Sequence, residues 1–182
     1  MLQTVPGKLD NPNSGYRLHF DKEDEFATSG YYSVCLKDYQ IKAELTATSR
    51  VAFHRYTFPE SSESHIIFDI GNKQGESVRV KDVRVVYTDA GRIEGYVITE
   101  PENVKKYQKG AETAMHFSAE LDKIPVSWDA FNVGNIRADI KEVNGSGAGL
   151  YFTFNTKENE NVTIQVGLLY TSIANARPDN QT

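Results

Sequence analysis

The feature that most constrains the fold is a strict two-residue alternation between apolar and polar side chains at residues 41–48. Ile41, Ala43, Leu45 and Ala47 alternate there with Lys42, Glu44, Thr46 and Thr48. Successive side chains point to opposite faces of a strand, so the segment predicts one apolar and one solvent-facing side. The same period recurs at 115–122 and 136–141, with no helical periodicity between these segments. The pattern therefore favours an all-β chain.

Composition agrees with this prediction. Val, Ile and Thr number 15, 11 and 13, whereas Leu and Met together number only 11. β-branched side chains pack well on pleated sheets and lose rotamer freedom in helices. Turn signals separate about ten segments of strand-like sequence, which is typical of an antiparallel β-sandwich. The expected strands are 31–39, 41–48, 50–58, 65–70, 77–88, 92–99, 115–121, 136–141, 150–154 and 162–172.

Three other stretches are expected to be irregular or to turn. Residues 1–19 are rich in Pro, Gly and Asn, which predicts an irregular lead-in. Residues 101–111 predict one helical turn or a long loop, and Asp89-Ala90-Gly91 predicts a tight turn. The 182 residues suit a single domain, so we expect one β-sandwich over 1–182.

Several classes of protein are disfavoured. The net charge of −5 comes without a basic cluster, which argues against nucleic-acid binding. No stretch is long and apolar enough to predict a membrane-spanning helix. Cys35 is the single cysteine, so neither an internal disulfide framework nor a cysteine-based zinc site is expected.

Two groups of charged residues are candidates for a site. The acidic residues Asp21, Glu23, Asp24 and Glu25 have the oxygens that calcium prefers, but their spacing lacks the Asp-x-Asp-x-Asp-Gly loop, so a solvated turn is favoured. His54 and Arg55 lie within an expected strand and must face opposite sides. One of them should therefore face the core or a cleft, where it needs a partner.

Aromatic residues offer a second kind of candidate. Tyr31, Tyr32 and Trp128 have faces on which a sugar ring can stack, although a lone Trp in a β domain is more often part of the core. Exposure of these side chains on one concave face would favour a stand-alone carbohydrate-binding module. No Gly-x-Ser-x-Gly or phosphate-loop motif occurs, so serine-hydrolase and nucleotide chemistry lack support.

A longer ordered pattern resembles a known family. It runs through the segments Gly30-Tyr31-Tyr32-Ser33-Val34, Ile41-Lys42-Ala43-Glu44-Leu45-Thr46-Ala47-Thr48 and Arg50-Val51-Ala52-Phe53-His54-Arg55-Tyr56-Thr57-Phe58-Pro59. Together these resemble the N-terminal domain of glycoside hydrolase family 92, the calcium-dependent α-mannosidases. Weaker similarity continues through Gly95-Tyr96, Phe117-Ser118-Ala119-Glu120, Gly147-Ala148-Gly149 and Val166-Gly167-Leu168 to Ala176-Arg177.

The resemblance implies a fold and an activity. It implies a supersandwich of the galactose-mutarotase-like kind, joined in the family to a helical barrel that carries the catalytic acid, the base and the calcium ligands. It implies inverting hydrolysis of terminal α-mannosidic bonds in glycans by a periplasmic or secreted bacterial enzyme. The compartment of this chain is not predicted from its own residues.

The same resemblance sets expectations for this chain. We expect most of the N-terminal domain without the catalytic helical domain, a scaffold and pocket wall that is inactive alone. No catalytic residue and no metal ligand are predicted in it. Contacts to substrate or to the helical domain are predicted for Glu23, Glu25, His54 and Arg55, the last because its planar fork suits hydroxyls and carboxylates. Uncovered strand edges lead us to expect self-association.

Overall fold

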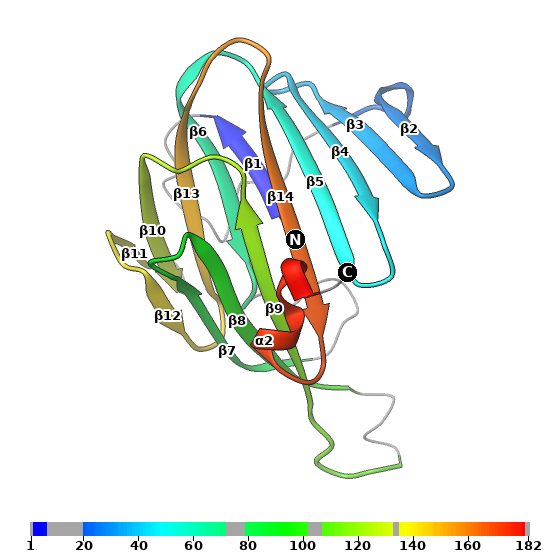
Figure 1. Cartoon of the computed structure of the whole chain (residues 1–182), viewed down its shortest axis with the longest axis vertical. Coiled ribbons are helices and arrows are strands. Elements are labelled where there is room, and N and C mark those ends of the chain that lie inside the picture. The colour runs from blue at the N-terminus through cyan, green and yellow to red at the C-terminus, as the bar shows by residue number, and fades with distance from the viewer. Residues whose placement is uncertain (1, 7–19, 72–78, 102–106, 133–134, 181–182) are drawn as a thin grey trace.

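Two antiparallel sheets lie face to face in the computed structural model (Figure 1), which describes residues 2–6, 20–71, 79–101, 107–132 and 135–180. The smaller sheet has the order β1-β6-β13-β10-β11 and the larger one the order β12-β7-β8-β9-β14-β5-β4-β3-β2. The smaller sheet consists of β1 (Leu2–Pro6), β6 (Ser61–Asp69), β13 (Ala148–Thr156), β10 (Ser127–Asn132) and β11 (Asn135–Ala138). This is the predicted all-β antiparallel sandwich.

The larger sheet carries the candidate site. It consists of β12 (Glu142–Asn144), β7 (Arg79–Tyr87), β8 (Arg92–Glu100), β9 (Thr113–Leu121), β14 (Glu160–Leu169), β5 (Val51–Phe58), β4 (Ile41–Ala47), β3 (Tyr31–Leu36) and β2 (Glu25–Thr28). The helical elements are short: η1 (Lys22–Asp24), α2 (Ile173–Ala176) and η2 (Pro178–Asn180). None of the helices in the described residues is long and apolar enough to cross a membrane.

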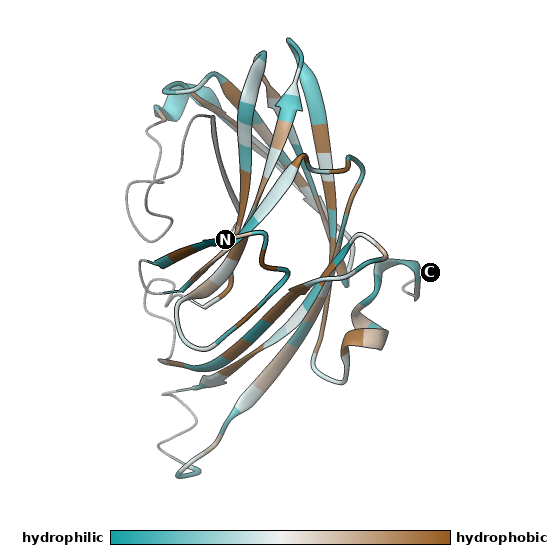
Figure 2. Cartoon of the chain, turned by 90° about the vertical axis from the view of Figure 1, so that its left-hand side faces the viewer, coloured by the Kyte–Doolittle hydropathy of each residue, from teal (hydrophilic) through white to brown (hydrophobic). Residues whose placement is uncertain are grey.

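The core lies between the two sheets because every second residue of the strands faces inward. Hydrophobic and hydrophilic residues alternate along the strands in Figure 2. Phe68 of β6 and Phe152 of β13 meet edge to face with ring centroids 5.7 Å apart. Ile41 and Ile164 of the larger sheet are fully buried on the same inner side. Burial of such side chains stabilises the sandwich by about 1.5–3 kcal/mol each.

Most predicted strands are present, with some differences at the N-terminal side. The lead-in predicted over residues 1–19 is wrong for Leu2–Pro6, which pairs with β6 from Leu2↔Phe68 to Pro6↔Ser64. Pairing with an existing strand outweighs the local Pro and Gly signals there, and residues 7–19 lie outside the described residues. The strands β2, β10 and β12 were not predicted. The loop or helical turn expected at 101–111 falls partly on residues 102–106, outside the described residues.

The prediction of a wholly solvent-facing side of residues 41–48 is also wrong at one position. β4 has the expected period, with Ile41 and Ala43 buried and Lys42 exposed. Glu44, however, is only 7% exposed, because side chains from β3 and β5 cover it. The edges of the two sheets are β1, β11, β12 and β2. Self-association through them stays a prediction.

Candidate functional site

A hollow of about 300 Å³ opens on the face of the larger sheet that points away from the smaller sheet, here called the outer face. Strand register brings its residues together: Tyr31 lies opposite Thr46 and Thr46 opposite Phe53. In the next row Glu44 lies opposite Arg55, and Arg55 opposite Thr163. The residues that line this outer hollow are Tyr31, Glu44, Leu45, Thr46, Phe53, His54, Arg55 and Thr163.

Glu44 is the buried charge at the centre of the outer hollow. Its Oε2 accepts a hydrogen bond from Arg55 Nε at 2.8 Å, and its Oε1 accepts one from Arg55 Nη2 at 2.8 Å. Oε1 also accepts from Tyr31 Oη at 2.6 Å and from Lys42 Nζ at 3.3 Å. The Arg55 bonds, and after them the Tyr31 bond, lower the pKa of Glu44 to about 2. The carboxylate is therefore charged at neutral pH, as a two-pronged Arg pair requires.

Arg55 keeps its position while staying open to solvent. Its side chain is 53% exposed, whereas that of Glu44 is 8% exposed. Both bonds to Glu44 use the Nε and Nη2 edge of the guanidinium, which leaves its remaining N–H groups for other acceptors. A fixed fork of donors at a surface hollow suits recognition of oxygen-rich ligands.

Aromatic and hydroxyl side chains complete the wall. Tyr31 and Phe53 are both half-buried. The exposed Phe26 of β2 extends the aromatic side, with its ring centroid 6.3 Å from that of Tyr31. Thr46 Oγ1 donates to the Gly30 carbonyl at 2.6 Å, which leaves its oxygen lone pairs as acceptors. The hollow thus combines one apolar side with a few oriented polar groups.

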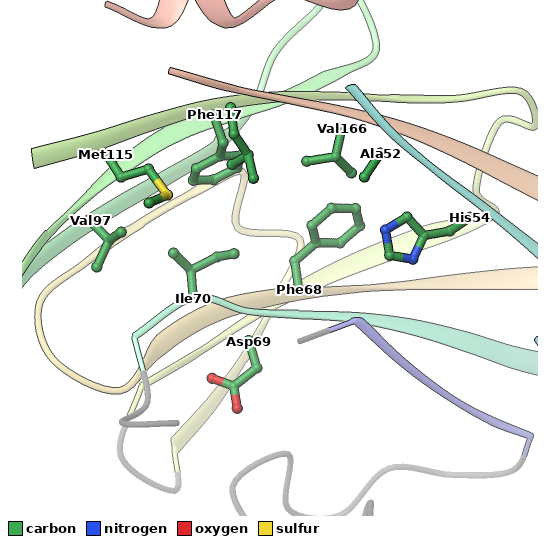
Figure 3. A pocket seen from close by; sticks show the side chains of 10 residues that line it. Ala52, His54, Phe68, Asp69, Ile70, Val97, Met115, Phe117 and Val166 are labelled. Carbon is green, nitrogen blue, oxygen red and sulfur yellow. The ribbon is translucent and has the colours of Figure 1, made fainter. Parts of the chain in front are cut away.

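His54 faces the other side of the same strand, as the sequence predicts for this pair of neighbours. Its ring points into an apolar cavity of about 400 Å³ between the sheets, beside Phe68 and Val166 (Figure 3). Nδ1 lies 3.2 Å from Tyr56 Oη. Burial lowers the pKa of His54, so the ring is neutral at neutral pH. This arrangement is that of a structural histidine with an apolar surround.

Of the four predicted site residues, Arg55 places its side chain at the outer hollow, and His54 belongs to the lining although its ring points into the inner cavity. Neither Glu23 nor Glu25 lines the outer hollow. Glu23 lies in η1 and is exposed. Glu25 is exposed on β2 and accepts a hydrogen bond from Tyr32 Oη at 2.6 Å. Burial, followed by this contact, raises the pKa of Tyr32 to about 12. Glu25 and Tyr32 therefore form a separate pair on the inner side of the sheet.

The acidic segment around Glu23 forms ion pairs of its own. Lys37 Nζ lies 2.6 Å from Asp21 Oδ2 and 2.8 Å from Asp24 Oδ2. Within the described residues, no group of three or more His, Cys, Asp or Glu side chains is arranged to hold a metal ion. In the structure, Asp21 and Asp24 of this segment share Lys37 as their cationic partner.

The three candidate stacking residues do not share one platform. Tyr31 and Tyr32 are neighbours on β3 and face opposite sides of the larger sheet. Trp128 belongs to β10 of the smaller sheet, packs against the core and has its ring 5.2 Å from that of Tyr87. Tyr31 instead combines with Phe53, which was not predicted as a site residue.

The sequence interpretation missed Glu44 and its counterpart, Glu94. Glu94 of β8 is also 7% exposed on the outer face, and its Oε1 accepts from Arg177 Nε at 2.9 Å and from Ser118 Oγ at 3.1 Å. Arg177 belongs to residues 172–180, here called the C-terminal strap, which lies across the outer face (Figures 1 and 2). Opposite charges at facing positions of neighbouring strands were the available signal for Glu44 and Arg55.

The strap is fixed closely to the sheet. A Cβ atom at Gly167 of β14 would lie 1.8 Å from the Ala176 carbonyl oxygen, so this position needs glycine. Ser172 caps α2 by accepting from Asn175 N at 3.2 Å, and Arg92 Nη2 donates to Asp179 Oδ2 at 3.2 Å. The strap therefore covers the half of the outer face around Glu94. The half around Glu44 is left open as the outer hollow.

Comparison with known proteins assigns this chain to a protein family. Residues 1–168 match the family model described as the glycosyl hydrolase family 92 N-terminal domain. A family GH92 α-mannosidase from Bacteroides thetaiotaomicron, solved in complex with mannoimidazole, is similar with a TM-score of 0.85 and 23% identity. That match covers 100% of this chain and 24% of the mannosidase. No curated protein matches the chain.

Two further structures have the same fold. A family GH92 inverting mannosidase from Bacteroides thetaiotaomicron VPI-5482 gives a TM-score of 0.79 at 18% identity, covering 96% of this chain and 22% of its own. The family GH92 glycosyl hydrolase ccman5 gives 0.76 at 23% identity, covering 100% and 25%. The chain therefore spans about a quarter of the length of these proteins.

Proposed function

The chain belongs to the glycosyl hydrolase family 92 N-terminal domain family, and we propose that it serves as the β-sandwich of an α-mannosidase. In this role it is a scaffold and a pocket wall, and a helical catalytic domain hydrolyses terminal α-mannosidic bonds beside it. The observation that carries the proposal is the match of residues 1–168 to the family model.

The outer face of the larger sheet is the side on which we propose that the helical domain packs. The strap lies on this face, and its last described residues, Pro178–Asn180, lie beside β9 and β14. The solved relatives are about four times as long as the part that this chain matches. A domain that follows the strap would therefore begin on the outer face, next to the outer hollow.

Arg55 is the predicted site residue best placed for the pocket wall. Its fork is held by Glu44 and remains open to solvent, so it can meet a substrate hydroxyl or a carboxylate of the helical domain. Calcium, in this proposal, is held by the helical domain, where it supplies Lewis-acid chemistry. In this proposal the residues of this chain position and orient the substrate beside the helical domain.

Assays of hydrolysis test the proposal. The purified chain should not hydrolyse an aryl α-mannoside, with or without calcium. Co-expression with the helical catalytic domain of a family 92 α-mannosidase should give calcium-dependent hydrolysis. The matched control is the helical domain expressed alone, which should be much less active. Calcium-dependent turnover by this chain alone would contradict the proposal.

A further inference from the structure

We propose that the outer hollow is itself a binding site for the ring of a neutral hexopyranoside, held by Arg55, Tyr31 and Phe53 without any help from another domain. The site is argued from the geometry of the hollow. The choice of an α-mannoside as the probe rests on the proposed function.

The charge of the hollow favours a neutral ligand. Among the side chains that line the hollow, Glu44 and Arg55 are the charged pair, opposite unit charges joined by two bonds of 2.8 Å, so the lining presents a dipole and no net charge. Lys42, which also bonds to Glu44 Oε1 at 3.3 Å, lies outside this lining. An anion would gain from Arg55 but lie within reach of the Glu44 carboxylate, and a cation would meet the reverse. A ligand with hydroxyl groups meets neither penalty, because a hydroxyl both donates and accepts.

The polar groups of the lining are complementary to adjacent hydroxyls. Arg55 offers N–H donors on the edge that Glu44 does not use. Tyr31 Oη donates to Glu44 at 2.6 Å, and Thr46 Oγ1 donates to Gly30 O at 2.6 Å, so both hydroxyl oxygens keep acceptor capacity. Donors and acceptors therefore lie side by side across β3, β4 and β5, as a vicinal diol requires.

Size and the apolar side point to a ring. The volume of about 300 Å³ lies at the lower end of the range for ligand pockets, which suits one small ring rather than an extended chain. Phe53 supplies an apolar surface in the same row as Tyr31 and Thr46. A pyranose has both an apolar face and a hydroxyl rim, and this combination matches the two sides of the hollow.

Preorganisation distinguishes this site from an ordinary surface ion pair. Arg55 is anchored by a carboxylate that is only 7% exposed, so the fork does not have to be ordered when a ligand arrives. Arg84 gives the contrast within the same sheet. Its Nε donates to Glu142 Oε1 at 2.7 Å, but the Glu142 side chain is 44% exposed, and Arg84 does not line the outer hollow.

The experiment is a titration of the ¹⁵N-labelled 182-residue chain with methyl α-mannopyranoside, followed by amide chemical shifts. Saturable shifts are expected at residues 31, 44–46 and 53–55. Inorganic phosphate is titrated separately as a probe for anion binding, and it should not saturate the same amides. No saturable shift with the mannoside, or saturation at amides of another surface, overturns the proposal, as does phosphate binding in place of the sugar.

Variants localise the binding energy. Arg55→Lys keeps the charge but loses the fork, and it should weaken binding by at least about tenfold. Phe53→Leu leaves the ion pair intact and should weaken binding several-fold. The matched control Arg84→Lys should change the affinity by less than about twofold. Equal affinities for Arg55→Lys, Phe53→Leu and the unchanged chain would overturn the site.

The outcomes separate this site from the proposed function. If the chain binds the sugar but gives no hydrolysis together with a catalytic domain, only the proposed function is contradicted. If the chain gives calcium-dependent hydrolysis together with a catalytic domain but binds no sugar alone, only the site proposed here is contradicted.

Discussion

The two halves of the outer face each bury a glutamate, and the arginine that pairs with it comes from a different part of the chain in each half. Each half has a glutamate that is 7% exposed, and each glutamate is paired with an arginine. Glu94 takes its arginine from the C-terminal strap, so the pair holds one piece of chain onto the sheet. Glu44 takes its arginine from the neighbouring strand, and no strap residue lines the hollow above it.

This difference shows how a buried ion pair can be structural in one place and available for binding in another. A buried pair is weak evidence for stability by itself, because desolvation of the charges offsets much of their attraction. The two pairs differ in their cover: the strap lies over Glu94, whereas the hollow above Glu44 is open. The covered half should therefore respond to substitution through stability, and the open half through ligand affinity.

The largest expected effect tests the close packing of the covered half. Gly167→Val places side-chain atoms where the Ala176 carbonyl lies, 1.8 Å from an added Cβ, and should lower the free energy of unfolding by about 3 kcal/mol. Gln165→Val is the matched control, since Gln165 is exposed on the same face of β14. It should change stability by less than about 0.5 kcal/mol in chemical denaturation. Equal effects at both positions would contradict a fixed strap.

The next effect ranks three of the arginine–glutamate pairs on the outer face. Arg177→Met leaves Glu94 with Ser118 and should cost about 2 kcal/mol of stability, as expected for a buried charge that loses its partner. Arg55→Met leaves Glu44 with Tyr31 and Lys42 and should cost about 1 kcal/mol. Arg84→Met, at an exposed pair, should cost less than about 0.5 kcal/mol. Urea denaturation gives the order, and a reversed order would contradict the comparison.

Acid should weaken the open half through Glu44. Its pKa of about 2 lies below the ordinary value of 4.5, so its contribution to stability is complete above about pH 4.5 and is lost as the pH falls towards 2. The difference in unfolding free energy between the unchanged chain and Glu44→Gln should therefore shrink over that range. Denaturation curves at a series of pH values measure it, and a difference that is independent of pH would refute the assignment.

The smallest effect concerns His54, which lies behind the open half on the inner side. Burial holds its pKa below the ordinary value of 6.5, so the protein should lose some stability as the pH falls below that value, when the unfolded chain takes up the proton first. His54→Leu should reduce the shift of the melting temperature between about pH 7 and about pH 5. An unchanged shift would mean that His54 is not buried neutral.

The strands that could be predicted from the sequence either alternate between buried and solvent-facing positions or, like β6 and β13, contain a run of buried apolar residues. Ile41 to Ala47 is the clearest case of alternation, and β4 keeps the period from Ile41 to Ala43, whereas Glu44 is buried and Ala47 is exposed. β10 has neither signal. Both of its sides are buried, since Ala130 faces the main core and Phe131 packs with Ile67 and Tyr151 in a second cluster. Its polar residues Ser127, Asp129 and Asn132 interrupt the apolar ones, so neither an alternation of polarity nor an apolar run marks the strand.

The candidate site was predicted only in part, and for a similar reason. The split of His54 and Arg55 onto opposite faces follows from strand geometry alone. The burial of Glu44 depends on the register that places Arg55 opposite it and on Tyr31 reaching across from β3. Residues that are distant in sequence create that environment. From the alternating pattern alone, Glu44 was therefore expected to be exposed like the other residues on the polar side. The family resemblance, which rests on a long ordered pattern, was the stronger guide.

The central claim is that the pair in the open half is for binding and the pair in the covered half is for structure. Its most direct test measures the affinity for methyl α-mannopyranoside and the free energy of unfolding on Arg55→Lys and Arg177→Lys side by side. We predict that Arg55→Lys weakens binding by at least about tenfold with the smaller loss of stability, and that Arg177→Lys lowers stability and leaves binding within about twofold. Equal changes in both quantities for the two variants, or the reverse pattern, would contradict the claim.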